Sequence, residues 1–296
     1  MGVPSVAQVT GLLERRYPPS LASDWDAIGL VCGREEASVH RILLAIDPVQ
    51  AVVDEAIDHR VDLVIAHHPL FLRPVHSVAA STPKGRLVHD LIGHGIALYC
   101  AHTNADHASP GVSDALAGLL GLVEVRPLDP LPDGRTGTGR VGRLPEPVTV
   151  EQLAEQVAAV LPATSHGVRV AGDPMRPVQV VAVCGGAGDS LLDLAAGCAD
   201  AYVTADLRHH RAQDHLAGLR PPGCALIDVA HWASEWPWLP VAAQELRSDL
   251  AELGATVEVL VSAIPTDPWT AHLSVDERTN PPGIGADAGQ QPRSAP

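Results

Sequence analysis

The stretch "DLVIAHHPLF", residues 62–71, joins an apolar run to two adjacent histidines and a proline. The run from Leu63 to Ala66 predicts a short buried strand, which ends where His67 and His68 begin. These imidazoles are either packing residues in a turn or ligands that hold something. A histidine pair on its own is most often a turn with one exposed ring, so the rest of the chain has to decide.

The segments around this strand alternate between strands and helices. Apolar runs and periodicity predict strands at 41–47 and 96–102 and helices at 48–60 and 85–95. Such alternation is typical of a layered α/β unit with parallel strands. The second half repeats the pattern, with strands predicted at 179–186, 199–206, 225–231 and 255–262. We therefore predict an α/β fold.

The two halves also resemble each other in sequence. "DLVIAHH" (62–68) aligns with "DAYVTAD" (200–206), and "AHTNAD" (101–106) aligns with "AHWASE" (230–235). We infer two duplicated α/β lobes, each with α/β/α layers. The predicted division is a first lobe at 1–126, a Pro/Gly-rich linker at 127–147, a second lobe at 148–264 and a disordered tail at 265–296.

The overall composition excludes several classes of protein. A net charge of −15 argues against a nucleic-acid-binding surface, which usually needs a basic face. No apolar run approaches the ~18 residues of a membrane helix, and the N-terminal stretch does not read as a signal peptide. The five cysteines are scattered and form no CxxC pair, which favours free thiols in a reducing compartment. We expect a cytoplasmic protein with no nucleic-acid or membrane partner.

Side chains that suit a metal ion gather just past the predicted strands. They are His67, His68, His102, Asp106, Asp206, His231 and Glu235. Because functional groups collect at the carboxyl ends of parallel strands, facing lobes would bring these side chains to one cleft. Imidazoles and carboxylates together suit zinc, iron, manganese or cobalt. Their number exceeds what one catalytic zinc takes and favours two metal ions that share a bridging carboxylate.

Each motif also has a simpler interpretation. H-x-x-x-D alone is usually a surface pair or a helix cap. The metal interpretation gains because the motifs recur at strand ends, and because the spacing from His102 to Asp106 returns from His231 to Glu235. The segment "GTGRVG" (137–142) fits a dinucleotide-binding pattern but lacks the preceding strand and following helix that the pattern requires.

Six ordered motifs resemble the Nif-three-like family of dinuclear-metal-centre proteins, often named GTP cyclohydrolase 1 type 2 homologues. They are "WDAIGLVCG" (25–33), "AHHPLF" (66–71), "AHTNAD" (101–106), "CGGAGDSLL" (184–192), "TADLRHH" (204–210) and "AHWASE" (230–235). The resemblance covers the chain up to about residue 264. It implies a toroidal homohexamer, a trimer of dimers, with sites that face an internal cavity.

The resemblance also implies roles for individual residues. The implied metal ligands are His67, His68, Asp106, His231 and Glu235, with Glu235 as the bridge. His102 is a candidate for proton transfer, and Trp25 and Asp26 would lie on a loop near the cleft. The indole of Trp25 has an equally good interpretation as core packing. Candidates for orienting the substrate or the ligands are Thr204, Asp206 and His210.

The leading functional hypothesis is a metal-dependent hydrolase, because two divalent ions activate water and polarise the bond under attack. The resemblance implies GTP as substrate, with its imidazole ring opened by water. The same metal pair could instead cleave phosphoesters. The competing class is a non-catalytic metal-binding scaffold or regulatory protein that recruits a partner.

Overall fold

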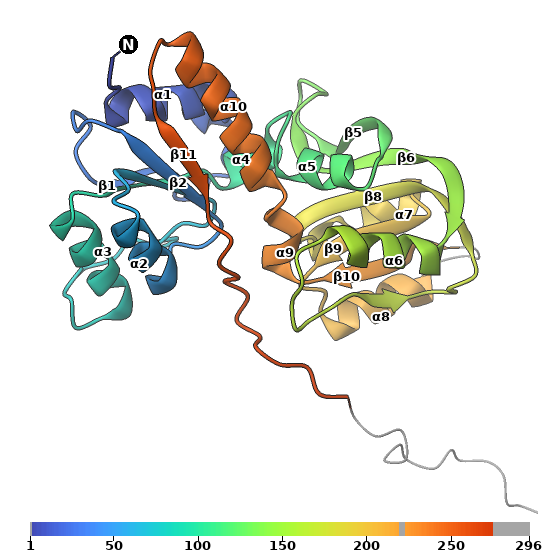
Figure 1. Cartoon of the computed structure of the whole chain (residues 1–296). Coiled ribbons are helices and arrows are strands. Elements are labelled where there is room, and N and C mark those ends of the chain that lie inside the picture. Colours follow the sequence, from blue (N-terminus) through green and yellow to red (C-terminus); the bar gives the residue numbers. More distant parts are fainter. Residues whose placement is uncertain (1, 219–222, 275–296) are drawn as a thin grey trace, which may run out of the picture.

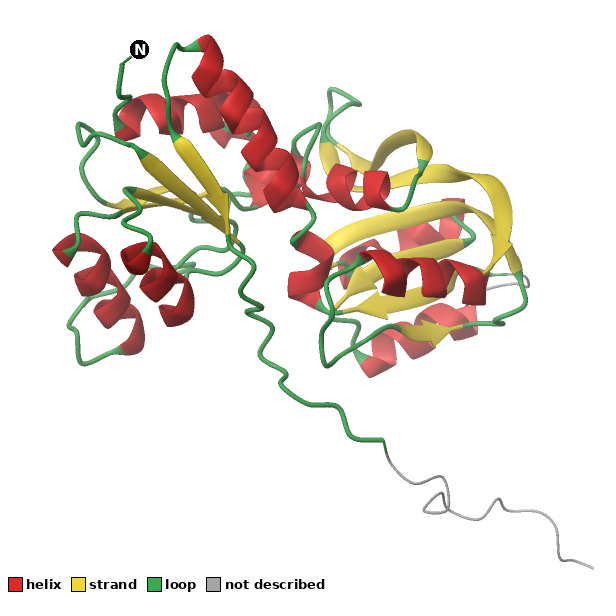
Figure 2. Cartoon of the chain, in the orientation of Figure 1, coloured by secondary structure: helices red, strands yellow, loops and turns green. Residues whose placement is uncertain are grey.

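The computed structural model describes residues 2–218 and 223–274. The chain forms two lobes, each with a sheet between helices (Figure 2). This agrees with the predicted fold class. Most of the predicted tail, from residue 275 on, lies outside the described residues.

The sheet of the first lobe is mainly parallel. Its strands are β1 (Gly29–Cys32), β2 (Arg41–Ala45), β3 (Leu63–Ala66), β4 (Ala97–Cys100) and β11 (Glu258–Val261). They lie in the order β1-β4-β3-β2-β11, and only the pairing of β1 with β4 is antiparallel. The inner strands β3 and β4 are buried at every position because helices cover both faces of the sheet.

Two pairs of helices cover this first sheet (Figure 1). The helices α1 (Val6–Arg16) and α10 (Trp238–Glu252) pack on the face that carries Ile42 and Leu44. The helices α2 (Gln50–Asp58) and α3 (Pro83–Gly93) pack on the opposite face, with Leu43 and Ala45. Successive side chains of a strand point to opposite faces, so β2 contributes to both cores. The short helices η1 (Pro19–Leu21) and α4 (Thr103–His107) lie in the connections.

The sheet of the second lobe is mixed. Its strands are β5 (Val123–Pro130), β6 (Gly137–Thr149), β7 (Arg169–Ala171), β8 (Pro177–Ala187), β9 (Ala201–Ala205) and β10 (Ala225–Val229), in the order β5-β6-β8-β9-β10-β7. The helices are α5 (Val112–Leu119) and α6 (Val150–Val160) on one face, α7 (Leu192–Cys198) and α8 (His209–Gly218) on the other, with η2 (Asp189–Leu191) and α9 (His231–Glu235) in the connections.

The two lobes repeat one topology, which agrees with the duplication inferred from the sequence. In the first lobe β2, β3 and β4 run parallel, and β1 pairs antiparallel with β4. In the second lobe β8, β9 and β10 run parallel, and β7 pairs antiparallel with β10. The connection after β4 carries α4, and the connection after β10 carries α9. The carboxyl ends of corresponding strands therefore hold corresponding positions in the two lobes.

The segment 127–147 is not a linker, contrary to the sequence prediction. It belongs to the β5–β6 hairpin of the second sheet. The prolines of β5 lie in an edge strand, where one side needs no hydrogen bonds. Gly137 has a φ of +146°, and a Cβ there would lie 2.2 Å from the carbonyl oxygen of Asp129. The prolines and glycines of this segment therefore belong to the strands and the turn of the hairpin.

The lobe boundaries also differ from the predicted ones. Helix α5 packs in the core of the second lobe, so the chain passes from the first lobe to the second before residue 126. Helix α10 and β11 return to the first lobe, where β11 pairs parallel with β2. Local patterns identified these elements, but a strand's partner depends on contacts remote in sequence.

The segment after β11 has no regular structure up to residue 274, and it leaves between the two lobes (Figure 1). It is not free of the fold, because the Thr266 hydroxyl donates to the Asp47 carboxylate. The first ten residues of the predicted tail, 265–274, are therefore described, and Thr266 contacts the first lobe. Within the described residues, no helix is long and apolar enough to cross a membrane.

Candidate metal centre

The candidate ligands come from two lobes and meet at their junction. His67 and His68 follow β3, and Asp106 lies in α4, directly after the neighbouring strand β4. The second lobe supplies His231 and Glu235, the first and last residues of α9. Residues four apart lie on the same face of a helix, so this imidazole and this carboxylate point the same way.

Glu235 is at the centre of the cluster and is only 3% exposed. Its Oε1 lies 3.0 Å from Nε2 of His231 and 3.5 Å from Nε2 of His67. Its Oε2 lies 3.1 Å from Nε2 of His68. Asp106 Oδ1 is 3.6 Å from Nε2 of His67. The structure therefore brings together all five residues that the resemblance implies as ligands.

The two histidines of the first lobe are held by their other ring nitrogen. Nδ1 of His67 is 2.9 Å from the carbonyl oxygen of Ala101, to which it donates. Nδ1 of His68 is 2.7 Å from Oδ1 of Asp47. These contacts turn both Nε2 atoms toward Glu235. Metal-binding histidines characteristically have such an outer hydrogen bond, which sets the tautomer and the ring orientation.

Two further histidines follow the same rule. Nδ1 of His231 is 2.8 Å from Oδ2 of Asp206, and Nδ1 of His102 is 2.8 Å from Oδ1 of Asp26. Asp206 and Asp26 therefore orient histidines. Among the described residues, two groups of three residues could each hold a metal ion, because the ligand atoms within each group lie within 4.8 Å of one another. The two groups share His68. The groups are His67, His68 and His102, and His68, His231 and Glu235.

Unpartnered buried atoms show that these residues fit metal ions. Among the described residues, Nε2 of His67 and Oε2 of Glu235 are buried without a hydrogen bond. Oε2 lies 3.1 Å from Nε2 of His68 but is without a hydrogen bond in the part of the chain that the structure describes. A buried polar atom left unsatisfied costs roughly 1–3 kcal/mol, and more if charged. Divalent cations of the zinc or iron type would satisfy both atoms, since they accept imidazole nitrogen and carboxylate oxygen.

The sequence matches known relatives over most of its length. The Duf34/NIF3 (NGG1p interacting factor 3) family model matches residues 4–268. The chain belongs to this family. It is 51% identical to a Streptomyces coelicolor GTP cyclohydrolase 1 type 2 homolog over 92% of this chain and 96% of that protein. A Mycobacterium tuberculosis protein of the same name is 38% identical, over 89% of this chain and 96% of the relative.

Solved structures give the same result for the fold of this family member. A Bacillus cereus protein related to NIF3 superposes with a TM-score of 0.83 at 25% identity, over 91% of this chain and 99% of that one. A Staphylococcus aureus hypothetical protein also reaches 0.83, at 27% identity over the same shares. The family resemblance predicted from the motifs is confirmed.

In this NIF3-family chain, Gly186 forms the wall behind Glu235, a role that the sequence analysis missed. A Cβ on Gly186 would lie 2.3 Å from Oε1 of Glu235, and the residue has a φ of +70°. Its N–H donates to the Ser234 hydroxyl, and its carbonyl accepts from the Thr204 hydroxyl. Thr204 is fully buried and therefore supports this wall. The adjacent glycines of "CGGAG" were the available signal.

The electrostatics of the cluster favour bound cations. Burial alone would raise the pKa of the Glu235 carboxyl, but His68, His231 and His67 outweigh it and hold the pKa well below its usual range. Burial would lower the pKa of His231, whereas Glu235 and Asp206 raise it to about 10. Burial raises the pKa of Asp106. Glu235 is thus a buried, ionised carboxylate that attracts positively charged groups.

Of the remaining candidates, Trp25 and Asp26 lie beside His102, whereas His210 lies elsewhere. Trp25 is 60% exposed, and its ring centroid lies 5.9 Å from that of His102, so Trp25 is at the rim of the centre and not in the core. Asp26 also accepts from the backbone N–H and hydroxyl of Thr103, which holds its carboxylate against His102. His210 is exposed on α8 and stacks edge-on with His209. It is not among the residues that the structure groups at the centre.

Proposed function

We propose that this chain holds two divalent metal ions and is a hydrolase that opens the imidazole ring of GTP. The observation that carries the proposal is Glu235, a buried carboxylate from one lobe placed among imidazoles from both. The proposed ligands are His67, His68, Asp106, His231 and Glu235, with Glu235 as the bridge. The substrate class is supported by the name of the two relatives, GTP cyclohydrolase 1 type 2 homolog.

The residues around the ions have distinct tasks. When bound, two such ions lower the pKa of water and polarise the bond under attack. Asp47, Asp206 and the Ala101 carbonyl keep three imidazoles aimed inward. Because Nδ1 of His102 is engaged by Asp26, its Nε2 is the atom available to take up or release a proton.

Replacement of one carboxylate oxygen tests the proposal. Glu235→Gln keeps the size of the side chain but removes the charge and one acceptor, so metal content and GTP ring opening should be lost together. Elemental analysis and a product assay measure the two. The matched control is Glu155→Gln, an exposed position on α6. Turnover that persists in a metal-free Glu235→Gln protein would contradict the proposed centre.

A substrate screen separates the other hypotheses. Metal-loaded protein that cleaves phosphoesters and leaves GTP intact would point to a phosphoesterase. Metal-loaded protein without turnover on nucleotides or phosphoesters would point to a non-catalytic scaffold.

We also propose a homohexamer, a trimer of dimers, on the strength of the family resemblance alone. Sedimentation equilibrium measures the assembly mass, and a monomer at all concentrations would contradict it. The described structure contains five unpaired cysteines, which supports our proposal that the protein works in the reducing cytoplasm.

A further inference from the structure

A two-part cavity adjoins the metal centre on the side of His68 and His231. Its inner part, about 290 Å³, is lined by these two histidines and by residues 266–269. Its outer part, about 630 Å³, is lined by residues 164–169 together with Trp269, Ala271 and His272. His166 and Trp269 line both parts, so the two parts adjoin each other. Together they match the usual size of a small-molecule site.

The inner part contains a carboxylate without a partner. Oδ2 of Asp267 is buried, and within the described residues it accepts no hydrogen bond. A carboxylate oxygen is an acceptor only, so the unmet requirement is for N–H or O–H donors. Asp47 and Asp206 line the same space, but each already holds a histidine. Asp267 is therefore the carboxylate that remains for a ligand.

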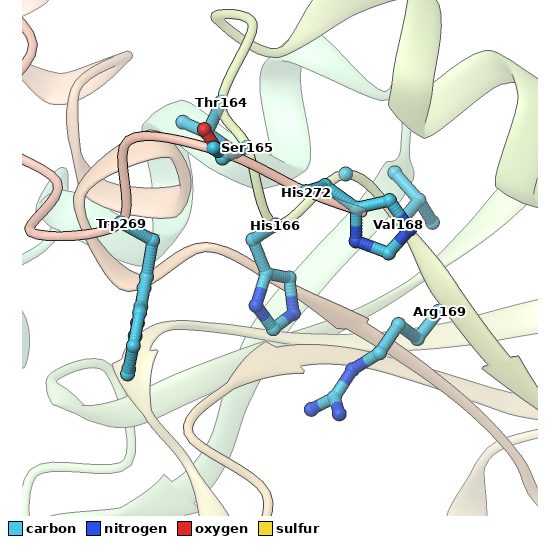
Figure 3. Close-up of a pocket in the computed structure, with 9 residues that line it drawn as sticks. Thr164, Ser165, His166, Val168, Arg169, Trp269 and His272 are labelled. Atoms are coloured by element: carbon cyan, nitrogen blue, oxygen red, sulfur yellow. The ribbon is translucent and has the colours of Figure 1, made fainter. Parts of the chain in front are cut away.

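The boundary between the two parts is aromatic. Trp269 is 68% exposed, a large exposure for an indole in a chain with few aromatic residues. Figure 3 shows its ring edge-on beside His166, so that its flat faces are directed into the pocket and away from it. A planar heterocycle can stack on such a surface, which is worth ~1–3 kcal/mol per base in nucleic-acid complexes.

The outer part offers cationic and imidazole groups. Arg169 is opposite Asp228 in the β7–β10 pair, and its Nε and Nη2 both donate to that carboxylate. Asp228 also accepts from His166. The remaining N–H groups of the guanidinium are free to bind a phosphate, because its side chain is 61% exposed. His272 lies on the same wall (Figure 3).

We propose that this cavity binds a guanine nucleotide, with the base on Trp269 and its N–H edge on Asp267, and with the phosphates toward Arg169. The inference rests on the proposed function and assigns residues to its substrate. Charge sets the orientation, since Asp267 repels phosphate and Arg169 attracts it. The base, and not a phosphoester, then faces the metal centre. Adenine binds less well, because its N1 presents a lone pair where guanine presents an N–H.

Equilibrium binding of GTP, ATP and guanosine to the metal-loaded full chain tests this assignment. Wild-type protein should bind GTP at least about tenfold more tightly than ATP, given the strength of hydrogen bonds to a charged acceptor. Asp267→Asn should weaken GTP and guanosine by about tenfold and leave ATP unchanged. Arg169→Gln should weaken GTP by a similar factor and leave guanosine unchanged.

The aromatic contact has its own variants. Trp269→Ala should weaken all three probes by about tenfold, and Trp269→Phe should restore most of the loss. Asp129→Asn, at an exposed position of β5, is the matched control and should bind as wild type. Elemental analysis of each variant should show unchanged metal content, which separates the cavity from the centre.

The results separate this inference from the proposed function. Equal affinity for GTP and ATP, or unchanged GTP binding in Asp267→Asn, would overturn the cavity assignment even if wild-type protein opens GTP. The expected binding pattern without turnover would sustain the cavity assignment and overturn the hydrolase.

Discussion

The strands β3 and β9 occupy the same place in the two lobes but end differently. After β3 come His67 and His68, whereas β9 ends at Ala205 and is followed by Asp206. In the first lobe the strand end therefore supplies candidate ligands directly. In the second it supplies a carboxylate that orients His231. The duplicated scaffold provides equivalent positions in the two lobes. The side chain at each position decides whether that position offers a candidate metal ligand or a partner that orients one.

The helices that follow β4 and β10 show a second difference. In each case a histidine precedes a carboxylate by four residues, with His102 as the N-cap of α4 and His231 as the first residue of α9. Glu235 of α9 reaches three imidazoles, whereas Asp106 of α4 is, among the residues that the structure describes, within ion-pair distance of His67 alone. The longer glutamate side chain spans the junction. The second lobe thus contributes the central acid, and the first lobe contributes most of the imidazoles.

The largest expected effect on metal binding comes from a substitution at Gly186, the residue behind the Glu235 carboxylate. Gly186→Ala places a methyl group where Oε1 of Glu235 lies, at a φ that alanine rarely adopts. We expect metal binding to fall by more than the roughly 100-fold upper range for an outer partner. Gly197→Ala on α7, with open space around its Cβ, should keep its metal. Elemental analysis and metal titration measure both, and a fully loaded Gly186→Ala protein would refute this role.

The next effect concerns the β5–β6 hairpin at the edge of the second sheet, where the first lobe has β11 instead. Arg140 is buried and pairs with Asp114 of α5, with Nη2 2.6 Å from Oδ2. It also donates to the carbonyls of Ala108, Gly137 and Gly139. Arg140→Met should lower the free energy of unfolding by about 3–5 kcal/mol, because it strands a carboxylate and several carbonyls.

Chemical denaturation measures this change. Arg143→Met, at an exposed position of the same strand, should stay within about 0.5 kcal/mol of wild type. Equal stability of the two variants would mean that the hairpin behaves as the linker first predicted.

The smallest effect sharpens the comparison of the two strand ends. Asp47→Asn removes the charged partner of His68 and should weaken metal binding by roughly 10–100-fold. Asp206→Asn should cost less, because the side chain of Asp206 is 56% exposed and that of Asp47 only 26%. Metal titration of both variants gives the order, and a larger loss for Asp206→Asn would reverse our ranking.

The sequence by itself determined the parallel strands, many of the helices and the candidate ligands. Helix α6 (Val150–Val160) has a capping box formed by Thr149 and Gln152, and their spacing in the sequence is the one that such a box requires. The histidines and acids at strand ends were visible because a parallel strand delivers its next residues to one edge of the sheet. The recurrence of H-x-x-x-acid in both halves marked the two segments that the structure shows as α4 and α9.

Only the tertiary structure decided which distant segments meet. Asp47 and Gly186 reach the centre through the pairing of strands and the facing of lobes. Asp47 carries no local signal of its role, and the glycines around Gly186 do not show that Glu235 lies against them. The hairpin at 127–147 reads as a linker because its prolines and glycines are turn residues, and only its pairing with β8 shows otherwise. The pairing of β11 with β2, and the return of residues 266–269 to the cavity, likewise depend on long-range contacts that no local pattern encodes.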